Sequence, residues 1–254
     1  MKKKQLTILG SFVLLYTLLV LLTYLVFPIE QLLPEGAEAP SLPLPGWAFG
    51  LANAGITLVV YGILGLAGYW FAGRLGLPGV YRPGAGWRQW LGIPLLLGLV
   101  VGALIVVIDQ LLAAAANRQG FPHPQFPLSI FASATAGIGE EILFRSFVLG
   151  LWAFLANLIL RRWGAKQVAL WIGNVIAALA FSAAHLPSAM TILGVATPGA
   201  IPASILLELF ILNSLLGLVA GERYMRQGLV AAIGVHFWAD IVWHVIWPLV
   251  AIWI

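Results

Sequence analysis

The chain alternates long apolar runs with short polar connectors. Apolar runs of roughly 17 to 25 residues have the length that a helix needs to cross a bilayer. Seven such runs predict seven transmembrane helices, over 6–27, 47–71, 90–112, 128–160, 168–185, 201–219 and 229–254. Connectors rich in proline and glycine predict loops at 28–46, 76–86 and 186–202. We therefore expect an all-α, polytopic transmembrane bundle that forms a single integral membrane domain over 1–254.

The composition supports this fold class and limits the chemistry. Of the 254 residues, 61% are hydrophobic and only 9% are charged, whereas soluble domains carry about 25% charged residues. The chain contains no cysteine. Disulfide bonds, thiolate nucleophiles and thiolate metal sites are therefore excluded.

The charged residues between the runs predict the orientation of the bundle. Short cytoplasmic loops collect lysine and arginine. Cationic residues gather before the first run and after the second, fourth and sixth: Lys2, Lys3, Lys4, Arg74, Arg82, Arg88, Arg161, Arg162, Lys166, Arg223 and Arg226. The other connectors hold only Arg118, and the first of them carries Glu30, Glu35 and Glu38. This predicts a cytoplasmic N-terminus, and it explains the net charge of +4 by membrane orientation rather than by nucleic-acid binding.

Three ionisable residues, Glu140, Glu141 and Arg145, lie inside the fourth apolar run. Each would cost at least about 2.5 to 3.5 kcal/mol at the centre of a lipid-facing helix, so all three must face protein or water. On a helix Glu141 and Arg145 share a face, and Glu140 is rotated by about 100°. We expect Arg145 to neutralise Glu141 and Glu140 to be available for chemistry. The alternative is a buried ion network that only holds helices together.

A histidine near the end of the fifth run is expected to face Glu140. The fourth and fifth runs predict a hairpin that turns near 161–164, which places His185 opposite Glu140. Phe181 lies one turn before His185 on the same face and is expected to wall the pocket or to pack. From 128 to 161 a helix is about 50 Å long, so this hairpin must tilt steeply or protrude into the cytoplasm.

The last run carries His236, Asp240 and His244 at spacings of four, which aligns them along one stripe. We expect Glu140, His185, His236 and Asp240 to line one polar cavity, open to the cytoplasm or to lipid. Two chemistries fit these groups. One is a divalent metal on the stripe, and the other is a water activated by a Glu/His pair with donors for an oxyanion. The remaining polar residues of the runs are expected to pack, cap or form interfaces: Asp109, Glu208, Asn213 and Glu222.

Three motifs on separate helices resemble those of the CAAX protease and bacteriocin-processing family, the glutamate intramembrane proteases that include the Ras-converting endopeptidase. They are Glu140-Glu141-x3-Arg145, Phe181-x3-His185 and His236-x3-Asp240. A further stretch, 217–229, is similar to the short turn that precedes the family's last motif. The resemblance covers 128–247, which would form the catalytic helices.

The resemblance implies an intramembrane endopeptidase with no obligatory metal cofactor. Glu140 with His185 would activate water, and His236 with Asp240 would stabilise the oxyanion. The supporting residues would be Glu141, Arg145 and Phe181. The implied partners are a peptide or membrane-protein substrate and the lipid bilayer, in a prokaryotic cell membrane. Many prokaryotic members have no prenylated substrate.

Two positions depart from the family pattern. Asp240 stands where the family often has asparagine, and an ionised aspartate can only accept a hydrogen bond. It is therefore expected either to be protonated or to orient His236. Ser146 stands where glycine is common. Two other functions remain open: a noncatalytic scaffold or immunity protein of the same fold, and an ion-coupled transporter, which also needs intramembrane Glu, His and Asp.

Overall fold

The computed structural model describes residues 2–28, 31 and 45–253. Within this part of the chain all regular structure is helical. Seven helical segments are long and apolar enough to cross a membrane: Lys2–Val26, Gly46–Leu75, Arg88–Ala115, Leu128–Trp163, Lys166–Leu193, Ala203–Gln227 and Leu229–Ala251. The seven predicted spans are confirmed, and the chain is an integral multi-pass membrane protein. The acidic residues of the first connector, Glu30, Glu35 and Glu38, lie outside the described residues.

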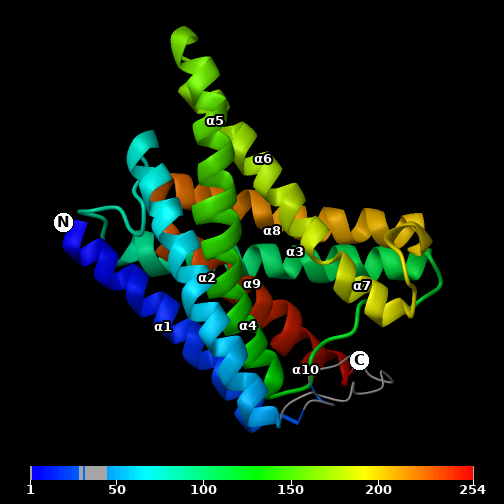
Figure 1. Cartoon of the computed structure of the whole chain (residues 1–254). Helices are drawn as coiled ribbons and strands as arrows, with labels where there is room; N and C mark the ends of the chain where they lie inside the picture. The colour runs from blue at the N-terminus through cyan, green and yellow to red at the C-terminus, as the bar shows by residue number, and fades with distance from the viewer. Residues whose placement is uncertain (1, 29–30, 32–44, 254) are drawn as a thin grey trace.

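The first three helices, α1 (Lys2–Val26), α2 (Gly46–Leu75) and α3 (Ile93–Ala115), precede the motif-bearing helices. The fourth span is one continuous rod of α4 (Leu128–Glu140), the π-helical segment Glu141–Leu149, and α5 (Gly150–Leu160). It is followed by α6 (Lys166–Ala184), α7 (Leu186–Leu193), α8 (Ala203–Gln227) and α9 (Leu229–Asp240). A second π-helical segment, Ile241–Ile246, leads into α10 (Trp247–Ala251). Figure 1 shows α5 extending past its neighbours, so the long hairpin protrudes from the bundle, one of the two arrangements that its length allowed.

The helices pack in a bundle whose outer surface is apolar. α8 packs against both α6 and α9, and α9 also packs against α3. On α2, Ile56, Val59 and Ile63 are each about 60% exposed, at 62, 60 and 63%. Large exposed apolar side chains in a membrane protein face lipid rather than water. The polar motif residues therefore lie inside this apolar shell.

Small residues bring α9, which carries two motif residues, close to α3. A Cβ atom on Gly98 would lie 2.7 Å from the backbone oxygen of Val235, and one on Gly102 would lie 2.7 Å from that of Ala239. Such contacts are shorter than real Cβ atoms make. Glycines four apart allow two membrane helices to approach at backbone distance. Because Val235 and Ala239 adjoin His236 and Asp240 in the chain, this contact sets the position of both motif residues.

Two predicted boundaries were wrong. Residues 186–193 were predicted to be loop but form α7, because Pro187 is tolerated in a first helical turn and Ala189 is buried in a small apolar cluster with Ile205 and Leu209. The sixth span also continues past 219 to Gln227. There Tyr224 is buried, and Gly228, with φ +95°, ends the helix.

Candidate active site

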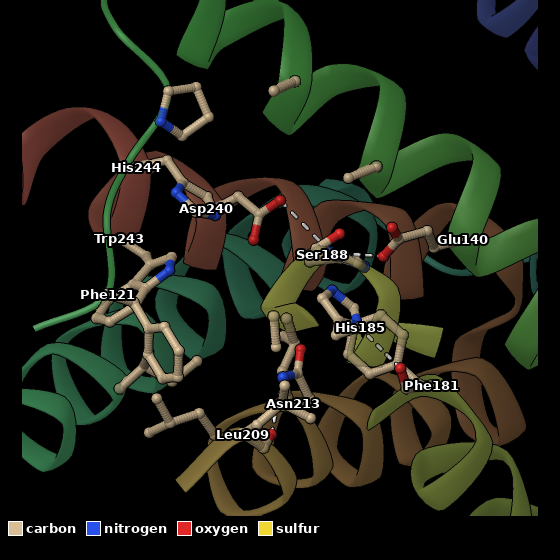
Figure 2. Close-up of a pocket in the computed structure, with 18 of the residues that line it drawn as sticks. Phe121, Glu140, Phe181, His185, Ser188, Leu209, Asn213, Asp240, Trp243 and His244 are labelled. Atoms are coloured by element: carbon tan, nitrogen blue, oxygen red, sulfur yellow. Dashed lines mark hydrogen bonds and ion pairs between the residues drawn. The ribbon is translucent and has the colours of Figure 1, made fainter. Parts of the chain in front are cut away.

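The four residues proposed from the sequence line one cavity. The cavity has a volume of about 360 Å³, and Glu140, His185, His236 and Asp240 all contribute to its wall. Figure 2 shows Glu140 and Asp240 reaching into it from one side and His185 from another. The structure thus brings together side chains from α4, α9 and the α6–α7 junction, which are far apart in the sequence.

Glu140 and Glu141 occupy different environments although they are adjacent in the chain. The Glu140 side chain is 31% exposed and lines the cavity, whereas Glu141 is fully buried. Glu141 Oε1 lies 3.3 Å from an Arg145 guanidinium nitrogen. This is the pairing that the four-residue spacing predicted. The π-helical segment begins directly after Glu140, and such widened turns often occur at functional sites.

Arg145 is completely buried and is held on two sides. Its guanidinium carbon lies 4.5 Å from the centre of the Phe181 ring, and a Cβ atom on Gly217 would lie 3.1 Å from a guanidinium nitrogen. Phe181 in turn packs edge-on against His185 and His236, with ring centres 4.8 and 5.5 Å apart. Phe181 therefore packs at the centre of the cluster and also forms part of the cavity wall.

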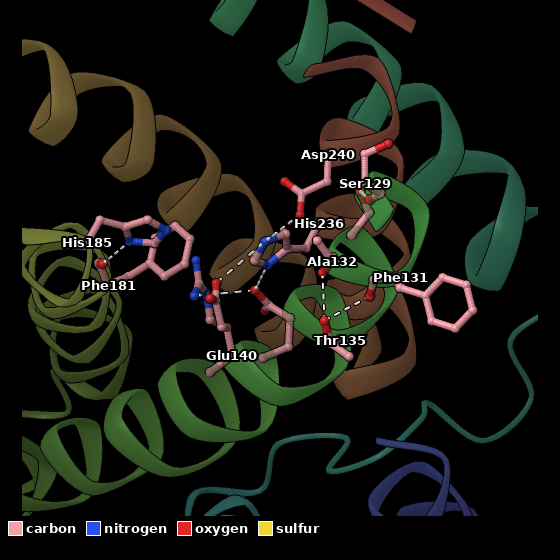
Figure 3. Close-up of polar contacts among 12 residues, drawn as sticks. Ser129, Phe131, Ala132, Thr135, Glu140, Phe181, His185, His236 and Asp240 are labelled. Atoms are coloured by element: carbon pink, nitrogen blue, oxygen red, sulfur yellow. Dashed lines mark hydrogen bonds and ion pairs between the residues drawn. The ribbon is translucent and has the colours of Figure 1, made fainter. Parts of the chain in front are cut away.

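His236 contacts three carboxylates. Its Nδ1 atom donates a hydrogen bond to Glu141 Oε1 at 2.8 Å, since a carboxylate oxygen can only accept. Its Nε2 atom lies 3.5 Å from Asp240 Oδ2 and 3.7 Å from Glu140 Oε2, as Figure 3 shows. The contact with Glu141 was missed in the sequence, because no spacing rule links residues 95 positions apart. It fixes the ring so that Nε2 points to the cavity carboxylates.

The hydrogen bond of His185 determines which of its nitrogens faces the cavity. Its Nδ1 atom lies 2.8 Å from the backbone oxygen of Phe181, which can only accept, so Nδ1 carries the hydrogen. In the neutral ring Nε2 is then an acceptor. No hydrogen bond or ion pair joins His185 to Glu140 among the described residues, and both groups line the cavity.

The third member of the stripe, His244, also lines the cavity but has a partner outside the motifs. Its Nδ1 atom lies 3.2 Å from Nδ1 of His123, in the loop before α4. His123 also packs edge-on against Trp243. Burial, with a smaller contribution from His244, lowers the pKa of His123 to about 4. Among the described residues no group of three His, Asp or Glu side chains has a geometry that would hold a metal ion.

The other polar residues named from the sequence divide into two kinds. Three are structural: Asp109 accepts the backbone N–H of Phe121, Glu208 pairs with Arg118, and Glu222 pairs with Arg223 and Arg226. Asn213, expected to pack, lies on the cavity wall instead, together with Ser188. Asn213 follows Leu209 by four residues and precedes Leu216 by three, and all three line the cavity. This helical spacing, visible in the sequence, indicates that the three residues share one face of α8.

Three residues of the cavity wall are exposed and mark where the cavity reaches the surface of the bundle. Its exposed wall residues, Pro122, Ser188 and Ile192, lie in the loop before α4 and in α7. Neither of these segments belongs to the cationic connectors that are predicted to be cytoplasmic.

A known protein family matches the part of the chain that supplies most of the cavity lining. Residues 122–242 match the family described as type II CAAX prenyl endopeptidase Rce1-like. The match contains the three motifs and confirms the resemblance to the CAAX protease family. No curated protein and no solved structure matches the chain.

Proposed function

We propose that this chain, whose residues 122–242 match the CAAX protease family, is an intramembrane endopeptidase that hydrolyses a peptide bond with a water activated by Glu140 and His185. One observation carries the proposal. Of two adjacent glutamates, Glu140 alone is exposed to the cavity, which it shares with two histidines.

In the proposed reaction Glu140, as a carboxylate, accepts a proton from a water molecule held between it and His185 Nε2. The resulting hydroxide attacks the carbonyl carbon of the scissile bond. The developing oxyanion accepts a hydrogen bond from His236 Nε2, and the proton on Glu140 passes to the leaving amine. General base catalysis and a positioned oxyanion donor each contribute a factor of roughly one hundred or more.

Asp240 has a positioning role in this mechanism. Its Oδ2 atom lies 3.5 Å from His236 Nε2. Negative charge near Nε2 favours a hydrogen on that nitrogen, so Asp240 would keep His236 competent as a donor. An aspartate can serve here in place of the asparagine common in the family, because it acts through His236 and does not itself donate to the oxyanion.

The test is cleavage by purified protein in lipid vesicles, with substrates found by mass spectrometry of new peptide termini in membranes that contain the protein. Glu140→Gln should lower turnover at least about a hundredfold. Glu222→Gln, which removes an acid from an ion pair at the end of α8, should keep turnover within about twofold, since partly exposed pairs contribute little. Full activity of the Glu140→Gln variant would exclude the mechanism, and absence of cleavage by the unmodified protein would favour a noncatalytic scaffold.

A second experiment distinguishes this mechanism from catalysis by a metal ion bound to His236, Asp240 and His244. Cleavage should survive treatment with a chelator and removal of metal verified by elemental analysis. A metal enzyme would instead lose turnover and recover it when a divalent ion is added.

A further inference from the structure

The wall of the cavity comes from one end of the bundle. Most of its lining residues lie in the loop before α4, in α4, in α7, in the first half of α8 and from His236 to His244, and the others lie on α3 and at the end of α6. These parts adjoin the connectors 116–127 and 194–202 and the last residues of the chain. In Figure 1 α7 and the C-terminus lie at the lower right, away from the N-terminus and the tip of α5. The cavity therefore has its mouth at that end.

The opposite end is closed by packed side chains. Leu75, Val80, Tyr224 and Leu229 are each at most 2% exposed. Backbone hydrogen bonds connect the connector after α2 to the junction between α8 and α9, from Leu229 N–H to Gly79 O and from Val230 N–H to Val80 O, both 3.0 Å. The fully buried Arg145 lies beside Gly217 of α8, between Asn213 on the cavity wall and Tyr224 in this layer. These packed side chains obstruct the approach of a peptide to Glu140 from this end.

The positive charges of the chain lie almost entirely at the closed end. Of the 13 lysines and arginines, 11 lie at the start of α1 or in and beside the three connectors of that end, one is the buried Arg145, and one is Arg118. Arg118 is at the open end and pairs with Glu208. Connectors rich in lysine and arginine remain in the cytoplasm. The closed end is therefore the cytoplasmic end.

From these three observations we propose that the cavity opens on the extracytoplasmic side of the membrane and receives substrate there. If the chain is the endopeptidase proposed above, its substrates are extended segments of secreted or membrane proteins that are exposed outside the cytoplasm. Phe121, Leu209 and Trp243 on the wall would accept apolar side chains beside the scissile bond. Proteins confined to the cytoplasm would not reach Glu140.

The chain contains no cysteine, so single cysteines can report access directly. Ser188→Cys places a thiol at the mouth, and Gln167→Cys places an exposed one at the cytoplasmic start of α6. In intact cells a small, charged, membrane-impermeant thiosulfonate should label Ser188→Cys and should leave Gln167→Cys unlabelled. In everted vesicles the pattern should reverse. Labelling of Ser188→Cys only from the cytoplasmic side, or only by a lipid-soluble reagent, would overturn the proposal.

Labelling does not require turnover, so it should be unchanged when Glu140→Gln is added. This separates the inference from the proposed function. If the labelling pattern is as expected but neither right-side-out nor everted vesicles cleave peptides, the endopeptidase assignment is wrong and the extracytoplasmic opening of the cavity is supported. The substrate for this test is a membrane-impermeant peptide that contains a cleavage site found by mass spectrometry of new termini. If everted vesicles cleave it and right-side-out vesicles do not, the extracytoplasmic opening is wrong and the endopeptidase assignment is supported.

Discussion

At the residue scale, Glu141 supports the site without facing the cavity. Its Oε1 atom contacts both the Arg145 guanidinium and His236 Nδ1. Glu141 therefore balances the charge of a fully buried arginine and orients the histidine whose other nitrogen faces Glu140. Removing it would leave Arg145 buried without a counter-ion, and removal of one partner of a buried pair is far more costly than its net contribution.

We expect Glu141→Gln to lower the free energy of unfolding by about 3 to 5 kcal/mol. Glu140→Gln should change the free energy of unfolding by much less, because Glu140 is partly exposed and Arg145 still has Glu141 as its counter-ion. Denaturant unfolding of both variants in the same detergent measures the difference. Equal stability of the two variants would contradict the assignment of Glu141 as the structural acid and Glu140 as the reacting one.

At the element scale, the close contact of α3 with α9 positions half of the site. We expect Gly102→Ala to displace α9, because the new Cβ atom would lie 2.7 Å from the Ala239 backbone oxygen, which cannot move without its helix. Turnover should then fall at least about tenfold with the protein still folded, as misplacement of reacting groups by about 1 Å can cost a hundredfold.

Gly62→Ala on α2 is the matched control, since nothing lies within 4 Å of its added Cβ atom. It should leave turnover unchanged and should stabilise the helix slightly, because alanine is favoured over glycine there by up to about 1 kcal/mol. Equal activity of the two alanine variants would show that the α3–α9 contact does not set the geometry of His236 and Asp240.

The loop 116–127, which forms part of the mouth, is held by Asp109, by Glu208 and by the His123–His244 contact. In that contact one Nδ1 atom donates a hydrogen bond to the other. If both Nδ1 atoms carried a hydrogen, the two N–H groups would repel each other. In the folded protein the pKa of His123 is about 4, below its ordinary 6.5. The neutral, packed form therefore contributes its full stability above pH 6.5 and loses it as the pH falls toward 4.

We expect a spin label at Gln119→Cys to become more mobile as the pH falls from about 6.5 to about 4, with the loop leaving Trp243. Adding His123→Gln should remove most of this pH dependence, because glutamine does not titrate in that range. A label whose mobility is independent of pH, or a pH dependence that persists without His123, would contradict the role of this histidine.

At the scale of the whole molecule, the distribution of positive charge predicts a cytoplasmic N-terminus, because lysine and arginine are retained on the cytoplasmic side. A green fluorescent protein fused before Lys2 should fluoresce, and alkaline phosphatase fused after the last helix should be active, because the first folds in the cytoplasm and the second only outside it. The opposite result for both reporters would reverse the orientation and would place the mouth of the cavity in the cytoplasm.

The apolar runs alone determined that the chain crosses the membrane seven times, because the free energy of placing a backbone in lipid depends on the length and composition of each segment. Local spacing likewise predicted the Glu141–Arg145 pair and the alignment of His236, Asp240 and His244 on one face. These relations lie within single helices, where the helical repeat fixes which side chains are neighbours. The short α7 was missed because its stability comes from packing on α8 rather than from its own pattern.

Only the tertiary structure decided which groups meet across helices and where the cavity opens. The contact of Glu141 with His236 and that of His123 with His244 join residues 95 and 121 positions apart. The first of them accompanies a close approach of α4 to α9, where a Cβ atom on Gly137 would lie 3.3 Å from the Phe237 backbone. The position of the mouth also depends on which end of the bundle is closed by packed side chains. In the sequence, Val80 and Tyr224 are only apolar residues near a connector, and nothing local shows that they close that end. Periodicity determines which face of a helix a residue occupies, whereas packing determines what that face meets.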